Sequence, residues 1–305
     1  MKSKCAEPDP RPYRGRFAPT PSGPLHLGSL VAAVGSYLDA KAHHGTWLLR
    51  IEDIDPPREV PGAADIIQRQ LEAHGLWWDK AVRYQSEQSA LYEHNLQQLT
   101  SAGYVYACDC TRKQIRSRAP YYTGFCRDRQ LPFASNALRF TNDTPTYTYL
   151  DCQQGEVSAQ HSWAAEDFIL KRRDGLWAYQ LAVVSDDRDQ GITHIVRGSD
   201  LMVPTLWQLS LWQRLNEVAT SQPLPSLRHL PLLTDAGGRK LSKQNHAPAI
   251  HAEQAVSNLS VALRALGLHL PEELHYEDVQ VILKWAIQAW SVQVEIGHLP
   301  HQARI

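Results

Sequence analysis

Apolar and polar residues near the start of the chain follow a strand, helix, strand order. Tyr13 to Ala18 has the short apolar pattern of a strand, and a loop rich in proline, serine and glycine follows it as far as Gly23. Helical spacing then runs from about Ser29 to His43, with Ser29 as the candidate N-cap. The apolar run Trp47 to Ile51 predicts a second, buried strand. This order predicts a βαβ unit of a parallel, doubly wound α/β sheet.

The rest of the chain alternates between helical stretches and one irregular segment. Helical spacing dominates from 61 to 103, and the pattern breaks between 108 and about 163, where arginine, tyrosine, threonine and proline are frequent. The α/β pattern then resumes with a helix starting over Tyr179 to Ser185, a strand Thr193 to Val196, a helix Leu201 to Leu215 and a last strand Leu230 to Leu233. We therefore expect a catalytic α/β domain split into residues 1–104 and 166–246, an insertion at 105–165, and a short helical part at 247–305.

Composition narrows the class of protein only slightly. The 305 residues are 43% hydrophobic, which is enough for a sizeable core, and the formal net charge of -1 does not by itself predict nucleic-acid binding. No apolar run is long enough to span a bilayer and no secretory leader is recognisable, so we expect a soluble, cytoplasmic protein, and we expect a monomer.

Two loops have the composition of phosphate-binding segments. The first, from 18 to 29, joins a strand to the start of a helix, where backbone N–H groups and the helix dipole favour an anion. Gly23 and Gly28 allow the backbone to approach a nucleotide, and His26 can hydrogen-bond to phosphate or ribose oxygens. The second loop, from 235 to 244, carries Lys240 and Lys243, which can clamp the pyrophosphate leaving group of ATP. Taken singly, each loop is better explained as an ordinary turn.

Together the two loops resemble the signature sequences HIGH and KMSKS of the class I aminoacyl-tRNA synthetases. Here they read His26-Leu27-Gly28-Ser29 and Lys240-Leu241-Ser242-Lys243-Gln244, so that Ser29 and Gln244 depart from the family pattern. The resemblance implies a Rossmann-type catalytic domain, catalytic roles for His26 and Lys243, and ATP contacts from His26, Gly28, Lys240 and Lys243. The implied reaction is attack of an α-carboxylate on the α-phosphorus of ATP, with Mg²⁺ neutralising the phosphates and no protein nucleophile.

Further residues look like the glutamyl and glutaminyl branch of that class, a resemblance that runs from about Arg14 to Gln244 and is carried by the stretches 16–23 and 49–55. An acidic amino acid needs a cation for its side-chain carboxylate and an anion for its ammonium group. Arg16 and Arg197 are the candidate cations, Glu52 is the candidate anion, and Tyr179 can supply a hydroxyl. The alternative is that these charged residues are ordinary solvated residues on the surface. The candidate glutamate-binding residues are Arg16, Phe17, Ala18, Pro19, Thr20, Glu52, Tyr179 and Arg197.

Three of the five cysteines gather in the predicted insertion as Cys108, Cys110 and Cys126. Thiolates select zinc, and four protein ligands would make the site structural, whereas the plainer interpretation is three buried cysteines without a metal. On physical grounds the fourth ligand can be Tyr121, Tyr122, Asp109 or Asp128. The spacing is similar to the zinc site of truncated glutamyl-tRNA synthetase paralogues, and that resemblance implies Tyr122. The basic and aromatic residues around the cluster, which favour RNA contact over a merely solvated face, are Arg112, Lys113, Arg116, Arg118, Arg127, Arg129, Tyr121, Tyr122 and Phe125.

The residues after the lysine loop are too few for the anticodon-binding domain of an ordinary glutamyl-tRNA synthetase, so we expect none. Together with the Cys-x-Cys insertion, this resembles the truncated paralogues that attach glutamate to queuosine in the anticodon loop of tRNA(Asp), and it implies tRNA(Asp) and L-glutamate as substrates. Three alternatives stay open: a ligase that passes activated glutamate to a non-tRNA acceptor, glutamylation of a tRNA 3′ end, and a silent RNA-binding paralogue. The presence of His26 and Lys243 argues against the last.

Overall fold

The first strand, helix and strand follow the order expected from the sequence. In the computed structural model, which describes residues 11–234, 248–296, 300, 303 and 304, β1 (Arg14–Phe17) pairs in parallel with β2 (Thr46–Ile51). The helix α1 (Leu27–Ala42) connects them, and the two-residue β3 (Arg83–Tyr84) extends the sheet in parallel beside β2. Parallel pairing brings the carboxyl ends of these strands to one edge of the sheet.

The start of α1 differs from the expectation. His26, not Ser29, is the N-cap: the Ser29 N–H donates to His26 Nδ1 at 3.2 Å, and the His26 N–H donates to Ser29 Oγ at 2.8 Å. The prediction of Ser29 as the N-cap is therefore wrong by three residues. A neutral imidazole nitrogen accepts a hydrogen bond as a serine oxygen does, and the serine hydroxyl returns the bond from the third helical position, which completes a capping box.

A second parallel pair lies next to the first. β9 (His194–Gly198) pairs with β10 (Ser226–Leu230), and the Thr193 N–H donates to the Arg14 carbonyl at 3.0 Å, which places the start of β9 beside β1. The helices of this half are α6 (Tyr179–Asp189) and α7 (Met202–Val218). The predicted strand Leu230 to Leu233 is wrong, because β10 ends at Leu230 and Leu233 begins the two-residue β11 (Leu233–Thr234). The real strand carries Arg228 and His229 in buried positions, so its apolar pattern is interrupted.

The segment between the two halves is antiparallel. β4 (Val105–Cys108), β5 (Ala137–Phe140) and β8 (Ile169–Lys171) form one sheet, and β6 (Thr148–Asp151) with β7 (Gly155–Ser158) forms a hairpin. The short helices here are α4 (Arg112–Arg118) and α5 (His161–Ala164). The sheet takes in β8, so it continues past the boundary expected at residue 165.

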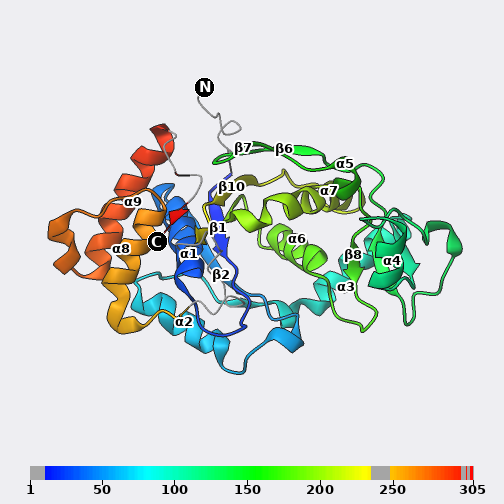
Figure 1. Ribbon diagram of the computed structural model, residues 1–305, viewed down its shortest axis with the longest axis horizontal. Coiled ribbons are helices and arrows are strands. Elements are labelled where there is room, and N and C mark those ends of the chain that lie inside the picture. The colour runs from blue at the N-terminus through cyan, green and yellow to red at the C-terminus, as the bar shows by residue number, and fades with distance from the viewer. Residues whose placement is uncertain (1–10, 235–247, 297–299, 301–302, 305) are drawn as a thin grey trace.

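Helices enclose the parallel strands, and the C-terminal helices complete the core. The remaining elements are α2 (Ala63–Ala73), α3 (Ser89–Ser101), α8 (Ala255–Ala265), α9 (Val279–Ile296) and β12 (Ala303–Arg304), with 3₁₀ turns at Pro56–Arg58, Gln85–Gln88, Arg127–Arg129, Ser199–Leu201, Ala252–Gln254 and Glu272–Tyr276. Figure 1 shows α8 and α9 at one end of the molecule, next to α1, and α4 at the other end. Trp290 of α9 is fully buried and donates from Nε1 to Asp39 of α1 at 2.9 Å. Within the described ranges, no helix is both long enough and apolar enough to cross a lipid bilayer.

Candidate functional site

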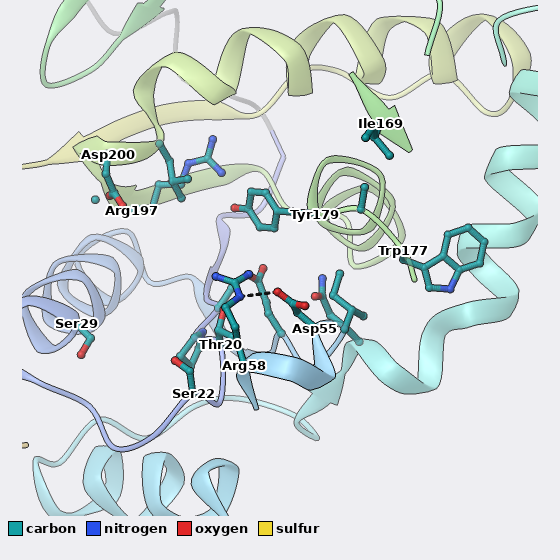
Figure 2. A pocket seen from close by; sticks show the side chains of 18 of the residues that line it. Thr20, Ser22, Ser29, Asp55, Arg58, Ile169, Trp177, Tyr179, Arg197 and Asp200 are labelled. Carbon is teal, nitrogen blue, oxygen red and sulfur yellow. Dashed lines mark hydrogen bonds and ion pairs between the residues drawn. The ribbon is translucent and has the colours of Figure 1, made fainter. Parts of the chain in front are cut away.

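A large cavity opens at the carboxyl ends of the parallel strands. Its volume is about 1300 Å³, and its wall includes the loop after β1, the residues that follow β2, the start of α6 and the end of β9. Ligands in parallel α/β sheets bind at this edge, because the loops there converge on one space. Figure 2 shows Arg197 and Tyr179 on the side formed by β9 and α6, and Thr20 and Ser22 on the side formed by the loop.

The structure brings most of the sequence-predicted residues together around this cavity. The predicted residues that line it are Arg16, Phe17, Ala18, Pro19, Thr20, His26, Glu52, Tyr179 and Arg197. Gly28 is not part of the wall and lies in the first turn of α1. Lys240 and Lys243 fall outside the residues that the structure describes.

Backbone hydrogen bonds hold the loop after β1 against its neighbours. The Glu52 N–H donates to the Pro19 carbonyl at 3.0 Å, and the Val60 N–H donates to the Pro21 carbonyl at 2.9 Å. Gly23 has a φ of 124°, a conformation that side-chain-bearing residues rarely adopt. The loop therefore reaches His26 and the N-terminus of α1 in a fixed path.

Arg16 is already paired within the protein. Its Nε and Nη2 donate to the two carboxylate oxygens of Asp187 at 3.0 and 3.2 Å, and both side chains are 3% exposed. Asp187 also accepts an ion pair from Arg50 Nη1 at 2.8 Å. Burial opposes the charged carboxylate, but Arg16 and Arg50 outweigh it and lower the pKa of Asp187. Arg16 thus faces the cavity with most of its charge compensated.

Arg197 is held quite differently. Its Nη2 donates to Thr205 Oγ1 at 2.7 Å and to Gln208 Oε1 at 2.6 Å, and its Nε donates to His229 Nε2 at 3.3 Å. All three acceptors are uncharged, and its buried Nη1 has no hydrogen-bond partner in the described part of the chain. Burial lowers the pKa of Arg197. A buried guanidinium with an unused donor is a ready partner for an incoming carboxylate.

Glu52 provides the opposite charge. Its side chain is buried, and Oε1 has no hydrogen-bond partner, although Arg50 Nη2 lies 3.7 Å away. Burial raises the pKa of Glu52 to about 7, even though Arg50 and Arg16 lower it. Tyr179 stands nearby with a hydroxyl whose pKa burial raises to about 12, so it remains a neutral donor. The cavity therefore offers an anion, a cation and a hydroxyl, the set that an acidic amino acid requires.

Sequence reasoning missed the residues that support these groups. Asp186 and Asp187 are buried, and Asp186 accepts hydrogen bonds from Gln85 Nε2 and the Tyr92 hydroxyl, both at 2.8 Å. The signal was present in the sequence, because α6 carries two adjacent aspartates directly after the apolar run Leu181 to Val184, which faces the core. His229 and Asp151 were missed as well, and nothing in their local sequence marks them.

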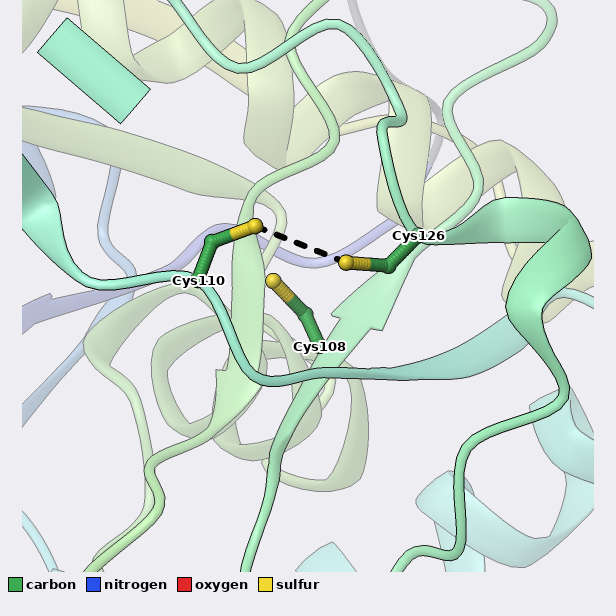
Figure 3. A group of neighbouring side chains, drawn as sticks. All are labelled: Cys108, Cys110 and Cys126. Atoms are coloured by element: carbon green, nitrogen blue, oxygen red, sulfur yellow. Dashed lines mark hydrogen bonds between the residues drawn. The ribbon is translucent and has the colours of Figure 1, made fainter. Parts of the chain in front are cut away.

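The three cysteines of the insertion converge. Figure 3 shows Cys108, Cys110 and Cys126 pointing toward one another; their Sγ atoms all lie within 4.8 Å, and those of Cys110 and Cys126 are 3.5 Å apart. All three are free, and Cys108 and Cys126 are buried. Three thiols in this geometry fit a tetrahedral zinc ion that has one further ligand.

The candidates for that further ligand differ in their surroundings. Tyr122 is fully buried in the cluster, and its hydroxyl accepts from the Cys126 N–H at 3.0 Å. Asp109 is engaged by Arg129 through both carboxylate oxygens, and Tyr121 is a half-buried residue whose hydroxyl donates to Gln160 at 3.5 Å. Tyr122 is thus the candidate whose side chain is enclosed with the thiols.

The basic residues around the cluster differ in whether they form ion pairs. Arg127 forms an ion pair with the buried Asp167, and Arg129 forms one with Asp109. No ion pair with a described residue is formed by the exposed basic residues of α4, namely Arg112, Lys113, Arg116 and Arg118. Arg112 and Cys110 also line the main cavity, so the basic region begins where the cavity meets the cysteine cluster.

Comparisons with known proteins identify the family of the chain. Residues 13–266 match the family model described as tRNA synthetases class I (E and Q), catalytic domain. The chain is 57% identical over 285 residues to the Glutamyl-Q tRNA(Asp) synthetase of Idiomarina loihiensis, covering 93% of this chain and 99% of that protein. It is 46% identical over 301 residues to the protein of the same name from Vibrio vulnificus, covering 99% of this chain and 96% of that one.

Solved structures show the same fold. A glutamate tRNA ligase from Elizabethkingia meningosepticum superimposes with a TM-score of 0.74 at 24% identity, over 90% of this chain and 64% of the ligase chain. This protein therefore spans a little under two thirds of that longer chain. The chain belongs to the class I tRNA synthetases of the glutamate and glutamine group, and within that group to the glutamyl-Q tRNA(Asp) synthetase family.

Proposed function

We propose that this protein activates L-glutamate with ATP and transfers the glutamyl group to the queuosine base of tRNA(Asp). The observation that carries the proposal is the pair of buried, incompletely satisfied charges at one cavity. Arg197 Nη1 and Glu52 Oε1 both lack hydrogen-bond partners among the described residues, and both side chains line the cavity. Leaving such groups unpaired is costly, so a ligand that satisfies both is expected. The names carried by the curated relatives point to the same substrates.

In this proposal Arg197 binds the side-chain carboxylate of glutamate and Glu52 binds its ammonium group. The Tyr179 hydroxyl contributes a further hydrogen bond, and Phe17, Ala18, Pro19 and Thr20 form the adjoining wall. Arg16 lines the same cavity, but its ion pair with Asp187 weakens its attraction for the glutamate carboxylate. Glutamine would leave the charge of Arg197 uncompensated, so the site favours the acid over the amide.

ATP would lie at the N-terminus of α1, with His26 and Gly28 on its phosphates and Lys240 and Lys243 on the leaving pyrophosphate. Mg²⁺ is expected to arrive with those phosphates. The described residues hold a single group of three metal-ligand side chains, the cysteines, and magnesium prefers oxygen ligands. The glutamate α-carboxylate attacks the α-phosphorus, pyrophosphate leaves, and the acyl group then passes to a hydroxyl of the acceptor.

We further infer how the chain is organised around this chemistry. The three-stranded sheet β1-β2-β3 and the pair β9-β10 would together form one Rossmann-type, doubly wound sheet, built from residues 1–104 and 166–246. The insertion at 105–165 would carry a structural Zn²⁺ on Cys108, Cys110, Cys126 and Tyr122. Residues 247–305 would serve as a helical support rather than as an anticodon-binding domain.

The exposed basic face of α4, where Arg112 also lines the cavity, is the proposed contact for the anticodon arm of tRNA(Asp). An anticodon loop presents unstacked bases, which suits a cavity that opens beside such a face. We expect the enzyme to act as a monomer in the cytoplasm, where this RNA is found.

The test is transfer of labelled glutamate, with ATP, to tRNA(Asp) that carries or lacks queuosine, with tRNA(Glu) and an RNA-free pyrophosphate exchange as controls. Label on queuosine-containing tRNA(Asp) alone supports the proposal. Label on tRNA(Glu) would make this a 3′-end synthetase, and glutamate-dependent exchange without labelled RNA would indicate a non-tRNA acceptor. No exchange in any of these assays would indicate a silent paralogue.

A further inference from the structure

We propose that Asp151 and His229 form a positioning pair that holds Arg197 in the orientation needed to bind the substrate carboxylate. Neither residue lines the cavity, so neither touches the substrate. The inference rests on the proposed role of Arg197 in glutamate binding, and it adds the reason why this arginine can stay buried and charged without an acidic partner.

The sheet places His229 directly beside Arg197. The two residues are Cα partners in the parallel pair β9-β10, so their side chains project from the same face of the sheet. His229 is fully buried and Arg197 is 6% exposed. Arg197 Nε donates to His229 Nε2 at 3.3 Å, which fixes the inner edge of the guanidinium.

Asp151 determines which nitrogen of His229 carries the proton. Asp151 Oδ1 accepts from the backbone N–H groups of Gln153, Gln154 and His229 at 2.9, 2.8 and 3.2 Å. Burial opposes its ionisation, but the hydrogen bonds with His229 and the backbone lower its pKa. Its other oxygen, Oδ2, lies 2.7 Å from His229 Nδ1. An ionised carboxylate can only accept, so Nδ1 carries the proton and Nε2 is the acceptor.

The surroundings of Nε2 leave Arg197 as its donor. Thr205 Oγ1 is also near, at 3.2 Å, but its hydroxyl donates to the Leu201 carbonyl at 2.7 Å and accepts from Arg197 Nη2. Burial lowers the pKa of His229, which keeps the ring neutral. A proton on Nε2 would instead point at the guanidinium.

This arrangement supplies a countercharge without occupying the donors of the arginine. The negative charge of Asp151 lies one imidazole ring away from Arg197, whereas Asp187 sits directly on Arg16 and uses two of its donors. The Asp151–His229 pair therefore stabilises a buried cation while Nη1 remains available for a ligand.

Four variants test the proposal by pyrophosphate exchange. Asp151→Asn is nearly isosteric and favours the opposite tautomer, and His229→Leu removes the acceptor. His229→Gln restores an acceptor near the position of Nε2. His74→Leu is the matched control, because His74 is a fully buried histidine that likewise has an acceptor at Nδ1, the Gln70 carbonyl, and a donor at Nε2, the Asn258 amide, but no charged partner there, and it does not line the cavity.

We expect Asp151→Asn and His229→Leu to raise the KM for glutamate by about tenfold or more, the loss of one hydrogen bond to a charged group, with the KM for ATP unchanged. His229→Gln should recover most of the lost affinity, and His74→Leu should change thermal stability alone. A wild-type glutamate KM in Asp151→Asn would overturn the proposal. The proposal would also be overturned if His229→Leu lowered kcat instead of raising the glutamate KM and His74→Leu lowered kcat in the same way.

A second measurement does not depend on the substrate. The ¹⁵N spectrum of labelled histidine should show His229 as the neutral, Nδ1-protonated tautomer, converted by Asp151→Asn. Protonation at Nε2 in the wild-type protein would reject the pair outright. Failure of the wild-type enzyme to exchange with glutamate would instead reject the proposed function, so the two failures can be told apart.

Discussion

Arg16, which lines the cavity, donates two hydrogen bonds to the carboxylate of Asp187, at 3.0 and 3.2 Å. Asp187 is shared with Arg50, which is fully buried and also approaches Asp186 and Glu52 at 3.9 and 3.7 Å. Burial alone would lower the pKa of Arg50, but these carboxylates raise it. Strand β1, the end of β2 with Glu52, and the C-terminal half of α6 are therefore joined through one buried ionic network.

Asp187→Asn should destabilise the fold, because it leaves two buried arginines with incomplete charge compensation. We expect the free energy of unfolding to fall by about 3 kcal/mol or more in urea titrations at pH 7. Asp143→Asn is the control. It removes the ion pair between Arg214 and Asp143, and the Asp143 side chain is 47% exposed, so the free energy of unfolding should change by about 0.5 kcal/mol or less. Equal effects of the two substitutions would contradict the structural role of Asp187.

Arg197→Gln should impair glutamate binding far more than ATP binding. Removing this cation, which has no direct acidic partner among the described residues, should raise the KM for glutamate by about 100-fold in pyrophosphate exchange and leave the KM for ATP within about threefold. Glutamine should gain relative to glutamate, because the variant pocket no longer demands a negative charge. Arg58→Gln, at an arginine 65% exposed on the cavity rim, should leave the glutamate KM near the wild-type value. If both variants behave alike, general electrostatics explains the effect rather than a specific contact.

The candidate glutamate pocket could be anticipated from sequence because its residues follow predicted strands. Arg16, Glu52 and Arg197 all lie at or just after strand ends, and parallel pairing brings those ends together. The different roles of Arg16, which pairs with Asp187, and Arg197, which has no direct acidic partner in the part of the chain that the structure describes, could not be anticipated. Asp187 is 171 positions from Arg16, and no local pattern shows which arginine it will neutralise.

Polar residues in the core also account for the errors in the elements. The predicted position of β10 was wrong because the strand contains two buried polar residues and so lacks a continuous apolar run. Arg228 is paired with Asp39, and His229 is paired with Asp151. The helix start was misplaced because a histidine side chain makes the cap that serine was expected to make. The periodicity of apolar residues shows which apolar positions are buried. It does not show polar positions that are buried because distant segments supply their charged partners.

Glutamate binding should weaken below neutral pH. Burial raises the pKa of Glu52 to about 7 in the unliganded protein, and protonation removes the charge that pairs with the substrate ammonium. As pH falls through 7, the fraction of ionised Glu52 falls, so the KM for glutamate should rise by about tenfold for each unit below the pKa. The substrate groups keep their charges over this range, so they add no slope of their own.

The matched variant is Glu52→Gln, measured as the glutamate KM between pH 5.5 and 8.5. It should show a high KM that no longer depends on pH. If its KM keeps the wild-type slope, another group titrates and Glu52 is not the partner of the ammonium.

Removal of zinc should loosen the insertion, and Tyr122 can be separated from its neighbour. We expect one zinc per chain in protein purified without chelator. Cys110→Ser should lose the metal together with thermal stability, because it removes one of the three thiolates that would hold the ion. Tyr122→Phe should weaken zinc binding by about 10-fold to 100-fold in chelator competition, as expected when a ligand or its hydrogen bonds are lost. Tyr121→Phe, at the neighbouring half-buried tyrosine whose hydroxyl donates to Gln160, should bind zinc as the wild type does. Unchanged zinc affinity in Tyr122→Phe would assign the fourth position to another residue, and Asp109→Asn would then be the variant to measure, since the Cys126 thiol lies 3.6 Å from the Asp109 carboxylate.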